Sequence, residues 1–226
     1  MRYFNLIIFS LLSCSTEQSQ KSISTLSSFK DSTSYSLGAD IGENLKKQNV
    51  EIDYDVFMAG LADGMETGLI KLDQKERREV MIAFQKKMKE KAGLEGKNNL
   101  ILADEFLKKN IIDPDVKETP TGLQYRIIKE GDGASPKKDD RVRVHYVGRL
   151  IDGTEFDSSI KRGEPSEFGL TQVIKGWTEG LQLMNLGAKY EFFIHPKDAY
   201  GPRPRPTIPA NSLLIFEVEL LDIISK

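Results

Sequence analysis

The sequence has very few of the residues that build disulfide frameworks and metal sites. Its 226 residues include one cysteine, Cys14, and two histidines, His145 and His195. A single thiol cannot form an internal disulfide, and structural zinc sites take their four ligands from clustered Cys and His residues. The chain is long enough to be stabilised by apolar cores instead, and we expect no metal and no cofactor.

The sequence also lacks an excess of positive charge. It has 32 Lys and Arg residues against 34 Asp and Glu residues, and its formal net charge is -2. Domains that bind nucleic acids carry a basic patch or stripe, and no basic stripe with interleaved aromatic residues occurs here. We therefore expect no nucleic-acid partner.

Long hydrophobic runs are absent near the amino terminus. The apolar stretch Leu6–Leu12 is far shorter than the roughly 20 residues of a transmembrane helix. Behind the positive charge of Arg2, it is typical of a signal-peptide core. The segment Leu11–Cys14, LLSC, resembles the lipobox of bacterial lipoproteins, in which the cysteine is lipidated and becomes the mature amino terminus. The alternative is a chance cysteine at the end of a cleaved signal peptide.

The lipobox interpretation predicts a signal peptide at residues 1–13 and lipid attachment at Cys14. Residues 14–31 are rich in Ser, Thr, Gln and Lys, and we expect a flexible tether because they have too few apolar side chains to fold. The protein would then be anchored by lipid to a membrane of the bacterial cell envelope. The expected location is the outer membrane, facing the periplasm.

Proline is absent from the first half of the chain, since all nine prolines lie from Pro114 onward. Because proline breaks helices, residues 32–112 can be continuous helix, whereas the second half cannot. Ser32–Ser34 and Asp53 are candidate N-caps for two helices. The change in proline content predicts a domain boundary near residues 112 and 113.

A third helix is predicted to run from Asp73–Glu76, which has the form of a capping box, to about Asn110. At ~1.5 Å per residue it would be about 55 Å long. A lone helix of this length cannot bury its own apolar stripe, so the two earlier helices or a second copy of the chain must cover it. We predict that residues 32–112 form a helical dimerisation domain and that the chain is a homodimer. A monomeric helical cap is the alternative.

The second half has the patterns of an antiparallel sheet and one short helix. Apolar and polar side chains alternate along Arg141–Leu150, as in a strand with one buried face. The segment Val173–Met184 has helical spacing and precedes Gly187, a candidate C-cap. The expected fold class is α+β with four or five strands. Further strands are predicted at Leu123–Ile127, Tyr190–Ile194 and Leu214–Leu220.

The register of the hairpin after Arg141–Leu150 decides where one aromatic side chain lies. Gly153 favours a tight reversal because it takes positive φ. A two-residue turn would set Phe156 opposite Arg149 on the polar face. A three-residue loop with a bulge would set Phe156 opposite Leu150, on the face of Tyr146. We favour the bulge, which makes this aromatic pair and the next carboxylate face one apolar hollow.

Four separated segments carry a resemblance to a known family. In sequence order they are VRVHYVGRLIDGTEFDSS, VIKGWTEGLQLMNLGAKYEFFI, AYG and LLIFEVELLDI. Together they resemble the FK506-binding-protein (FKBP) family of peptidyl-prolyl cis-trans isomerases, from Thr121 to the carboxy terminus. The helical half, with ADEFLKKN leading into TGLQYRII, resembles the amino-terminal dimerisation domain of Mip-like bacterial members. The resemblance implies an isomerase domain at residues 113–226, with a curved antiparallel sheet wrapped on one short helix.

The resemblance also implies a proline-binding pocket. Trp177 would be its floor, and the Ile174 N–H and the Tyr200 hydroxyl would hold substrate carbonyls. Asp157, partnered by Arg162, would supply a polar edge close to the twisting bond. The implied catalytic residues are Asp157, Tyr200, Tyr146, Phe156 and Trp177. The implied substrate-binding residues are Arg162, Val173, Ile174, Ile208 and Phe216.

Each of these residues also has a simpler interpretation. The aromatic residues would be core packing, and Asp157 with Arg162 would be a surface ion pair of little energetic value. Two positions depart from the family pattern. Ser166 stands where members often have an aromatic wall, and Pro202–Pro206 lacks a histidine that some carry. Both departures bear on substrate preference and inhibitor affinity.

The implied function is peptidyl-prolyl cis-trans isomerisation that assists the folding of extracytoplasmic proteins. Its partners would be proline-containing unfolded or partly folded proteins, and macrolides would be its inhibitors. Rotation about an X–Pro bond exchanges no proton and forms no covalent intermediate, which fits a sequence without a recognisable nucleophile and base. The alternative is a holdase chaperone that binds proline segments without catalysis.

Overall fold

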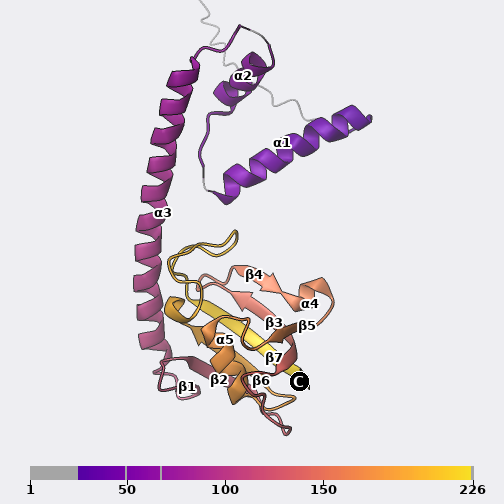
Figure 1. Ribbon diagram of the computed structural model, residues 1–226, viewed down its shortest axis with the longest axis vertical. Coiled ribbons are helices and arrows are strands. Elements are labelled where there is room, and N and C mark those ends of the chain that lie inside the picture. The colour runs from indigo at the N-terminus through magenta and orange to yellow at the C-terminus, as the bar shows by residue number, and fades with distance from the viewer. Residues whose placement is uncertain (1–24, 49, 67, 225–226) are drawn as a thin grey trace, which may run out of the picture. The chain divides into compact units, whose positions relative to one another are not determined.

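The computed structural model describes residues 25–48, 50–66 and 68–224, and it divides after Ile52 into two compact units (Figure 1). The predicted signal peptide and the lipid attachment at Cys14 lie outside the described residues. Within those residues, no helix has the length and apolar character needed to span a membrane. Each unit is described separately below.

The first unit contains helix α1, Phe29–Lys47. Its start is fixed by Ser28, whose side chain accepts a hydrogen bond from the Asp31 N–H at 3.1 Å. The Asp31 carboxylate accepts a hydrogen bond from the Ser28 N–H at 3.0 Å, which completes a capping box. The helix therefore begins at Phe29, inside residues 14–31, for which a tether is predicted. The predicted N-cap at Ser32–Ser34 is wrong, because these residues lie within the helix.

The second unit begins with helices α2, Tyr54–Met65, and α3, Gln74–Asn110. The side chain of Asp53 accepts a hydrogen bond from the backbone at the start of α2. At the start of α3, Asp73 and Glu76 exchange two side-chain to backbone hydrogen bonds of 2.8 Å. The predicted cap at Asp53, the capping box and the length of the third helix are confirmed.

The carboxy-terminal part of α3 packs on the sheet of its own chain. The side chains of α2, and those of α3 before Gly96, are not buried, whereas Ala103 is fully buried. The ring of Phe106 lies 5.8 Å from that of Phe193. Gln124, on the same sheet face, is 2% exposed and donates to the Leu107 carbonyl at 3.1 Å. The sheet thus covers part of the apolar stripe that the two earlier helices or a second copy of the chain were expected to cover.

Seven strands form one antiparallel sheet in the second unit, against the four or five expected. The path runs β1-β2-β6-β7-β3-β4, and β5 also pairs with β3, beside β4 along the same edge. The short strands β1 and β5 were not predicted, because they show too few alternations to be recognised. The strands are β1 Val116–Glu118, β2 Gln124–Lys129, β3 Arg141–Arg149, β4 Glu155–Ser158, β5 Ser166–Gly169, β6 Lys189–Ile194 and β7 Leu214–Ile224.

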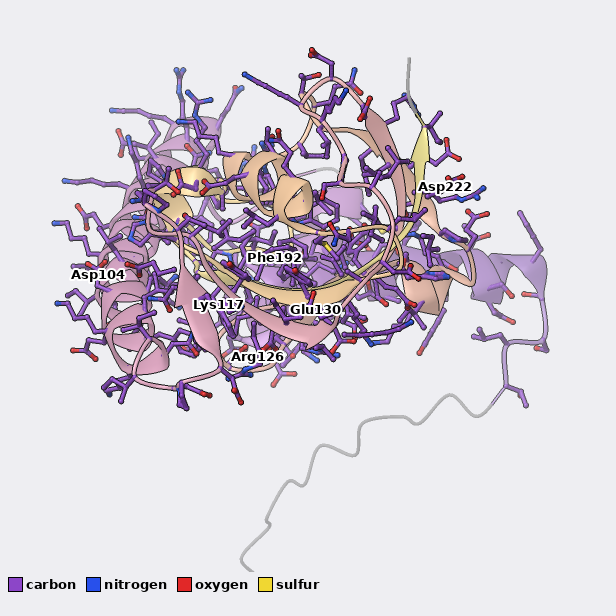
Figure 2. All side chains as sticks on the ribbon, turned by 90° about the horizontal axis from the view of Figure 1, so that it is seen from below. Asp104, Lys117, Arg126, Glu130, Phe192 and Asp222 are labelled. Carbon is purple, nitrogen blue, oxygen red and sulfur yellow. The ribbon has the colours of Figure 1, made fainter. Side chains whose placement is uncertain are left out.

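A short helix packs on one face of this sheet. Helix α5, Lys175–Gly180, lies so close to β6 that a Cβ atom on Gly180 would come within 2.7 Å of the Phe192 ring. Figure 2 shows Phe192 among the densely packed side chains of the interior, with Asp104 and Asp222 at the periphery. The predicted single helix Val173–Met184 is wrong in its bounds.

The helix gives way at its end to a 3-10 turn, Leu181–Leu183, and the chain is extended at Met184. Gly187, the expected C-cap, has φ +86° and leads into β6, where its N–H donates to the Leu220 carbonyl. This hydrogen bond to a distant strand stabilises a turn that sequence spacing alone attributes to a helix end.

Candidate active site

A cavity of about 450 Å³ lies between α5 and the sheet. Aromatic and aliphatic side chains make up most of its wall. The lining residues are Tyr146, Phe156, Asp157, Phe168, Gln172, Val173, Ile174, Trp177, Ala199, Tyr200, Arg205 and Phe216.

Trp177 is held in the wall by three aromatic neighbours. The side chain is 4% exposed and comes from the buried face of α5. The rings of Tyr146 and Phe216 lie 5.2 Å from the indole at interplanar angles of 88° and 79°, and that of Phe168 lies 5.3 Å away at 87°. Such edge-to-face contacts favour one orientation of each ring, so the indole is fixed before any ligand arrives.

The hairpin between β3 and β4 brings Phe156 to the cavity by a different register from either prediction. The Gly153 N–H donates to the Leu150 carbonyl at 3.0 Å, and Gly153 has φ +84°. Arg149 then pairs with Glu155 and Gly148 with Asp157, so Phe156 is itself the extra residue of the bulge. The predicted pairing of Phe156 with Leu150 is wrong, although the ring does reach the face of Tyr146.

Gly148 leaves the space that the two neighbouring rings occupy. A Cβ atom at this position would lie 2.6 Å from Cζ of Phe156 and 2.7 Å from Cε1 of Phe216. The two rings meet edge to face, with centroids 5.4 Å apart. A residue without a side chain is therefore required on this part of β3 for both rings to line the cavity.

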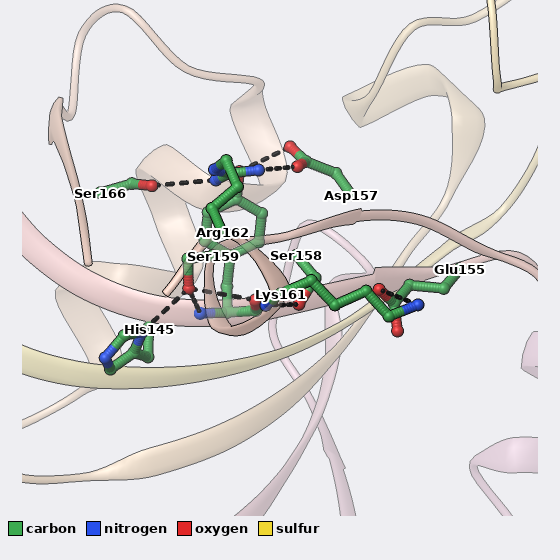
Figure 3. Close-up of polar contacts among 9 residues, drawn as sticks. His145, Glu155, Asp157, Ser158, Ser159, Lys161, Arg162 and Ser166 are labelled. Atoms are coloured by element: carbon green, nitrogen blue, oxygen red, sulfur yellow. Dashed lines mark hydrogen bonds and ion pairs between the residues drawn. The ribbon is translucent and has the colours of Figure 1, made fainter. Parts of the chain in front are cut away.

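A polar network forms one edge of the cavity (Figure 3). The Tyr146 hydroxyl donates to Oδ2 of Asp157 at 2.5 Å, and Arg162, from the helical turn α4 at Ser159–Arg162, donates to Oδ1 of the same carboxylate. The other terminal nitrogen of Arg162 donates to the Tyr146 hydroxyl at 2.9 Å and to Oγ of Ser166 at 3.0 Å. Ser166 thus joins the network from the place where an aromatic wall was noted as missing.

The network and its surroundings change the acidity of Tyr146. Burial is the main cause that raises the pKa of this phenol above 10.0, and the hydrogen bond to Asp157 raises the pKa further. The hydrogen bonds to Tyr146 and Asp157 also raise the pKa of Arg162. Tyr146 is therefore a hydrogen-bond donor, and Arg162 a cation, throughout the neutral range.

Several hydrogen-bonding groups in the wall have no partner among the described residues, and one of them is the buried Nε1–H of Trp177. In the described part of the chain, neither the backbone N–H of Ile174 nor the hydroxyl of Tyr200 has a hydrogen-bond partner. Ile174 precedes α5, and its carbonyl already accepts from the Trp177 and Thr178 N–H groups. The Ile174 N–H and the Tyr200 hydroxyl can therefore bind polar atoms of a ligand.

The structure brings together eight of the ten predicted site residues as cavity lining. Arg162 reaches the site through its hydrogen bonds to Asp157 and Tyr146, and Ile208 is 6% exposed within the core beside it. Four lining residues were not predicted. Phe168 lies on β5, on the same face as Ser166, and this strand is too short for its alternation to have been recognised. The others are Gln172, Ala199 and Arg205, and they come from loops without a pattern.

The site has no arrangement for metal binding or nucleophilic catalysis. Among the described residues, no group of three or more His, Cys, Asp or Glu side chains could hold a metal ion. His145 lies outside the cavity lining, where its Nδ1 is 3.0 Å from Oγ of Ser159. The arrangement is suited to binding an apolar ring beside a planar polar group.

Comparisons with known proteins agree with this geometry. A family model for "FKBP-type peptidyl-prolyl cis-trans isomerase" matches residues 133–221. A model for "Domain amino terminal to FKBP-type peptidyl-prolyl isomerase" matches residues 30–127. The two models together cover both halves of the chain.

Individual relatives extend the match over nearly the whole length. "Outer membrane protein MIP" of Legionella longbeachae is 42% identical over 217 residues, which cover 94% of this chain and 93% of that protein. The "FKBP-type 22 kDa peptidyl-prolyl cis-trans isomerase" of Escherichia coli is 38% identical over 209 residues, 88% of this chain and 98% of that protein. The crystal structure of FkpA from Escherichia coli matches with a TM-score of 0.64 at 36% identity, and the match covers 89% of this chain and 99% of that one. The chain therefore belongs to the FKBP-type peptidyl-prolyl cis-trans isomerases and is an enzyme of this family.

Proposed function

We propose that the cavity above Trp177 binds the prolyl ring of X–Pro segments in unfolded or partly folded extracytoplasmic proteins. The observation that carries this proposal is the aromatic cavity whose free hydrogen-bonding groups include the Ile174 N–H and the Tyr200 hydroxyl. A prolyl ring is apolar, while the amide beside it has carbonyl oxygens that need donors. The cavity offers both environments within one site.

Catalysis follows if such a site stabilises the twisted amide more than the planar amide. Rotation about an X–Pro bond has a barrier of about 18 to 20 kcal/mol because it breaks amide resonance. The twisted amide has less charge separation than the planar form, so an aromatic wall favours it relative to the ground state. Each ~1.4 kcal/mol of this preference raises the rate tenfold.

The polar groups hold the substrate in place while the bond turns. The Ile174 N–H and the Tyr200 hydroxyl donate to substrate carbonyls. Asp157, fixed by Tyr146 and Arg162, presents its carboxylate at the edge of the cavity close to the turning bond. Because hydrogen bonds within the protein already orient the carboxylate, little orientational freedom is lost when substrate binds.

The test is a protease-free assay of isomerisation on a short X–Pro peptide. Asp157→Ala should lower kcat/KM roughly tenfold or more. Asp222 is a matched control, because its ion pair with Arg143 has almost the same exposure as that of Asp157 with Arg162. Asp222→Ala should leave kcat/KM unchanged, and a macrolide of the rapamycin type should inhibit the unaltered chain. Equal rates in the two variants would contradict the proposed site.

We also propose that the helical half forms a homodimer. Apolar side chains of α2 and of the first part of α3 lie open to solvent; Met58 and Met65 are 58% and 83% exposed, and Val80 and Met81 are 54% and 52% exposed. A second copy of the chain would cover surfaces of this kind. Sedimentation of the full chain should give twice the monomer mass, and a monomer at micromolar concentration would contradict the proposal.

A lipid anchor at Cys14 would place the enzyme in the cell envelope. The sequence LLSC supports this, as does the name of the relative from Legionella longbeachae. Cys14→Ser should move the protein from the membrane fraction to the soluble fraction. Retention in the membrane fraction would contradict the anchor.

A holdase activity is the second candidate, and the exposed apolar helices favour it. It predicts that Asp157→Ala still suppresses aggregation of an unfolded protein after isomerisation is lost. Loss of both activities together would remove the holdase as a separate function.

A further inference from the structure

The loop that follows Tyr200 brings a charged side chain to the rim of the cavity. Arg205 donates its N–H to the Ile208 carbonyl at 2.8 Å, and the Ile208 N–H donates back to the Arg205 carbonyl at 3.2 Å. Ile208 is buried, and the Asn211 N–H closes the loop with a 2.8 Å hydrogen bond to the Gly201 carbonyl. The backbone of Arg205 is thus fixed on the side of the loop that lines the cavity.

The guanidinium group of Arg205 is close to the residues proposed to bind substrate. It lies over the Tyr200 ring, 4.9 Å from the ring centroid. Stacking on an aromatic face orients the planar group without removing its charge or its hydrogen-bond donors. The Tyr200 ring therefore keeps the cation at the cavity rim.

This charge has no counterpart in the part of the chain that the structure describes. There Arg205 has no ion-pair partner, whereas Asp157, the other charged lining residue, is paired with Arg162. The lining therefore presents one uncompensated charge, and it is positive. A carboxylate on a bound peptide would compensate that charge, and an ammonium group would be repelled.

We infer that Arg205 selects X–Pro segments with an acidic side chain next to the proline. The inference rests on the proposed function, because it needs a peptide in this cavity. A guanidinium group can donate two parallel hydrogen bonds to one carboxylate, which adds direction to the charge attraction. Arg205 is exposed to solvent, so salt screens the attraction and its effect on rate is modest.

The experiment compares kcat/KM for peptides that differ only in Glu, Gln or Lys beside the proline, at the preceding position and at the following one. Arg205→Ala in the full chain should lower the ratio of kcat/KM for the Glu peptide to kcat/KM for the Gln peptide. We expect a fall of about threefold at low salt, at one of the two positions. Arg205→Glu should lower this ratio further and raise the ratio of the Lys to the Gln peptide. Added salt should shrink both differences.

Arg203 provides the matched control. It is an exposed arginine of the same loop, two residues away, and it is not part of the cavity lining. Arg203→Ala should leave the ratios unchanged. An equal loss in both variants would show a general effect of loop charge and would overturn the assignment to Arg205.

The outcomes separate the inference from the function on which it rests. Absence of turnover on the Gln peptide by the unaltered chain would contradict the isomerase site itself. Normal turnover of the Gln peptide, with a Glu to Gln ratio that Arg205→Ala does not change, would overturn only the inference. An equal fall for all three peptides would show that Arg205 merely supports Tyr200, and would overturn it as well.

Discussion

The hydroxyl of Tyr146 donates a 2.5 Å hydrogen bond to the carboxylate of Asp157, across the bulge that places Phe156 in the cavity wall. Arg162 binds both partners of this hydrogen bond. The carboxylate is therefore oriented by one neutral and one charged donor. Such a network loses its geometry when a single donor is removed, because the remaining groups find new positions.

Tyr146→Phe removes the neutral donor and keeps the ring. We expect kcat/KM on a short X–Pro peptide to fall about tenfold, since hydrogen bonds to charged groups are worth about 1.5 kcal/mol or more. Tyr125→Phe is the control, because Tyr125 stacks on Tyr190 at 5.8 Å and lies outside the cavity lining. A similar loss in both variants would contradict a specific role of the Tyr146 hydroxyl.

The activity should be independent of pH through the neutral range. Tyr146 donates only while protonated, and burial followed by the Asp157 hydrogen bond raises its pKa above 10.0. We expect kcat/KM to be flat from about pH 6 to about pH 9, because the reaction moves no proton. An inflection near pH 6.5 would instead indicate a titrating histidine.

Stability should change at alkaline pH with a definite sign. A group whose pKa is higher in the folded state than in the unfolded state stabilises the fold. This stabilisation is complete at pH values below the pKa of the unfolded state, which is about 10 for tyrosine. That contribution is lost as pH rises through the folded pKa. Denaturant unfolding of the unaltered chain should therefore show falling stability above about pH 10. Tyr146→Phe should remove part of this fall, and identical curves would contradict the contribution of Tyr146.

Local patterns in the sequence predicted the strand Arg141–Leu150 and the capping box at Asp73, and the family resemblance implied the aromatic residues of the cavity except Phe168. The sequence predicted a bulge in the hairpin between β3 and β4 but paired Phe156 with Leu150, because the register depends on rings that meet over Gly148, one of them from the distant strand β7. Gln124 likewise has a polar side chain in a strand pattern. It is buried only because α3 covers it, and periodicity contains no information on such a contact.

Gly148→Ala should destabilise the fold and reduce activity together. The added Cβ would meet the Phe156 and Phe216 rings at 2.6 and 2.7 Å, so one ring must shift. Overpacking of this kind costs about 1 to 3 kcal/mol in the free energy of unfolding. Denaturant unfolding and the peptide assay measure the two effects.

Gly93→Ala is the matched control for Gly148→Ala. Gly93 lies within α3, and a Cβ atom there would have no heavy atom within 4 Å among the described residues. Alanine should increase the free energy of unfolding by up to about 1 kcal/mol, because glycine is a poor helix former. Its kcat/KM should not change. Destabilisation by both substitutions would contradict the steric explanation for Gly148.

Helix α3 contacts the loop that carries Tyr200 and Arg205 through two asparagines. The Asn99 side chain donates to the Ala210 carbonyl, and the Asn211 side chain donates to the Gly96 carbonyl, both at 3.0 Å. Asn211 has φ +55°, a conformation that asparagine tolerates better than most residues. These contacts tie one wall of the cavity to the long helix.

Asn99→Ala should loosen this wall. Loss of one hydrogen bond worth about 1 kcal/mol should speed hydrogen exchange of the Asn211 amide roughly fivefold, because its bond to the Gly201 carbonyl closes the loop. Asn110→Ala is the control. Asn110 also joins α3 to the sheet, because its side chain donates a 3.0 Å hydrogen bond to Gln124, but it is distant from the loop in sequence and does not contact it. If α3 orders the loop, only Asn99→Ala changes exchange at Asn211. Equal exchange rates at Asn211 in the two variants would show that the loop keeps its order without the helix.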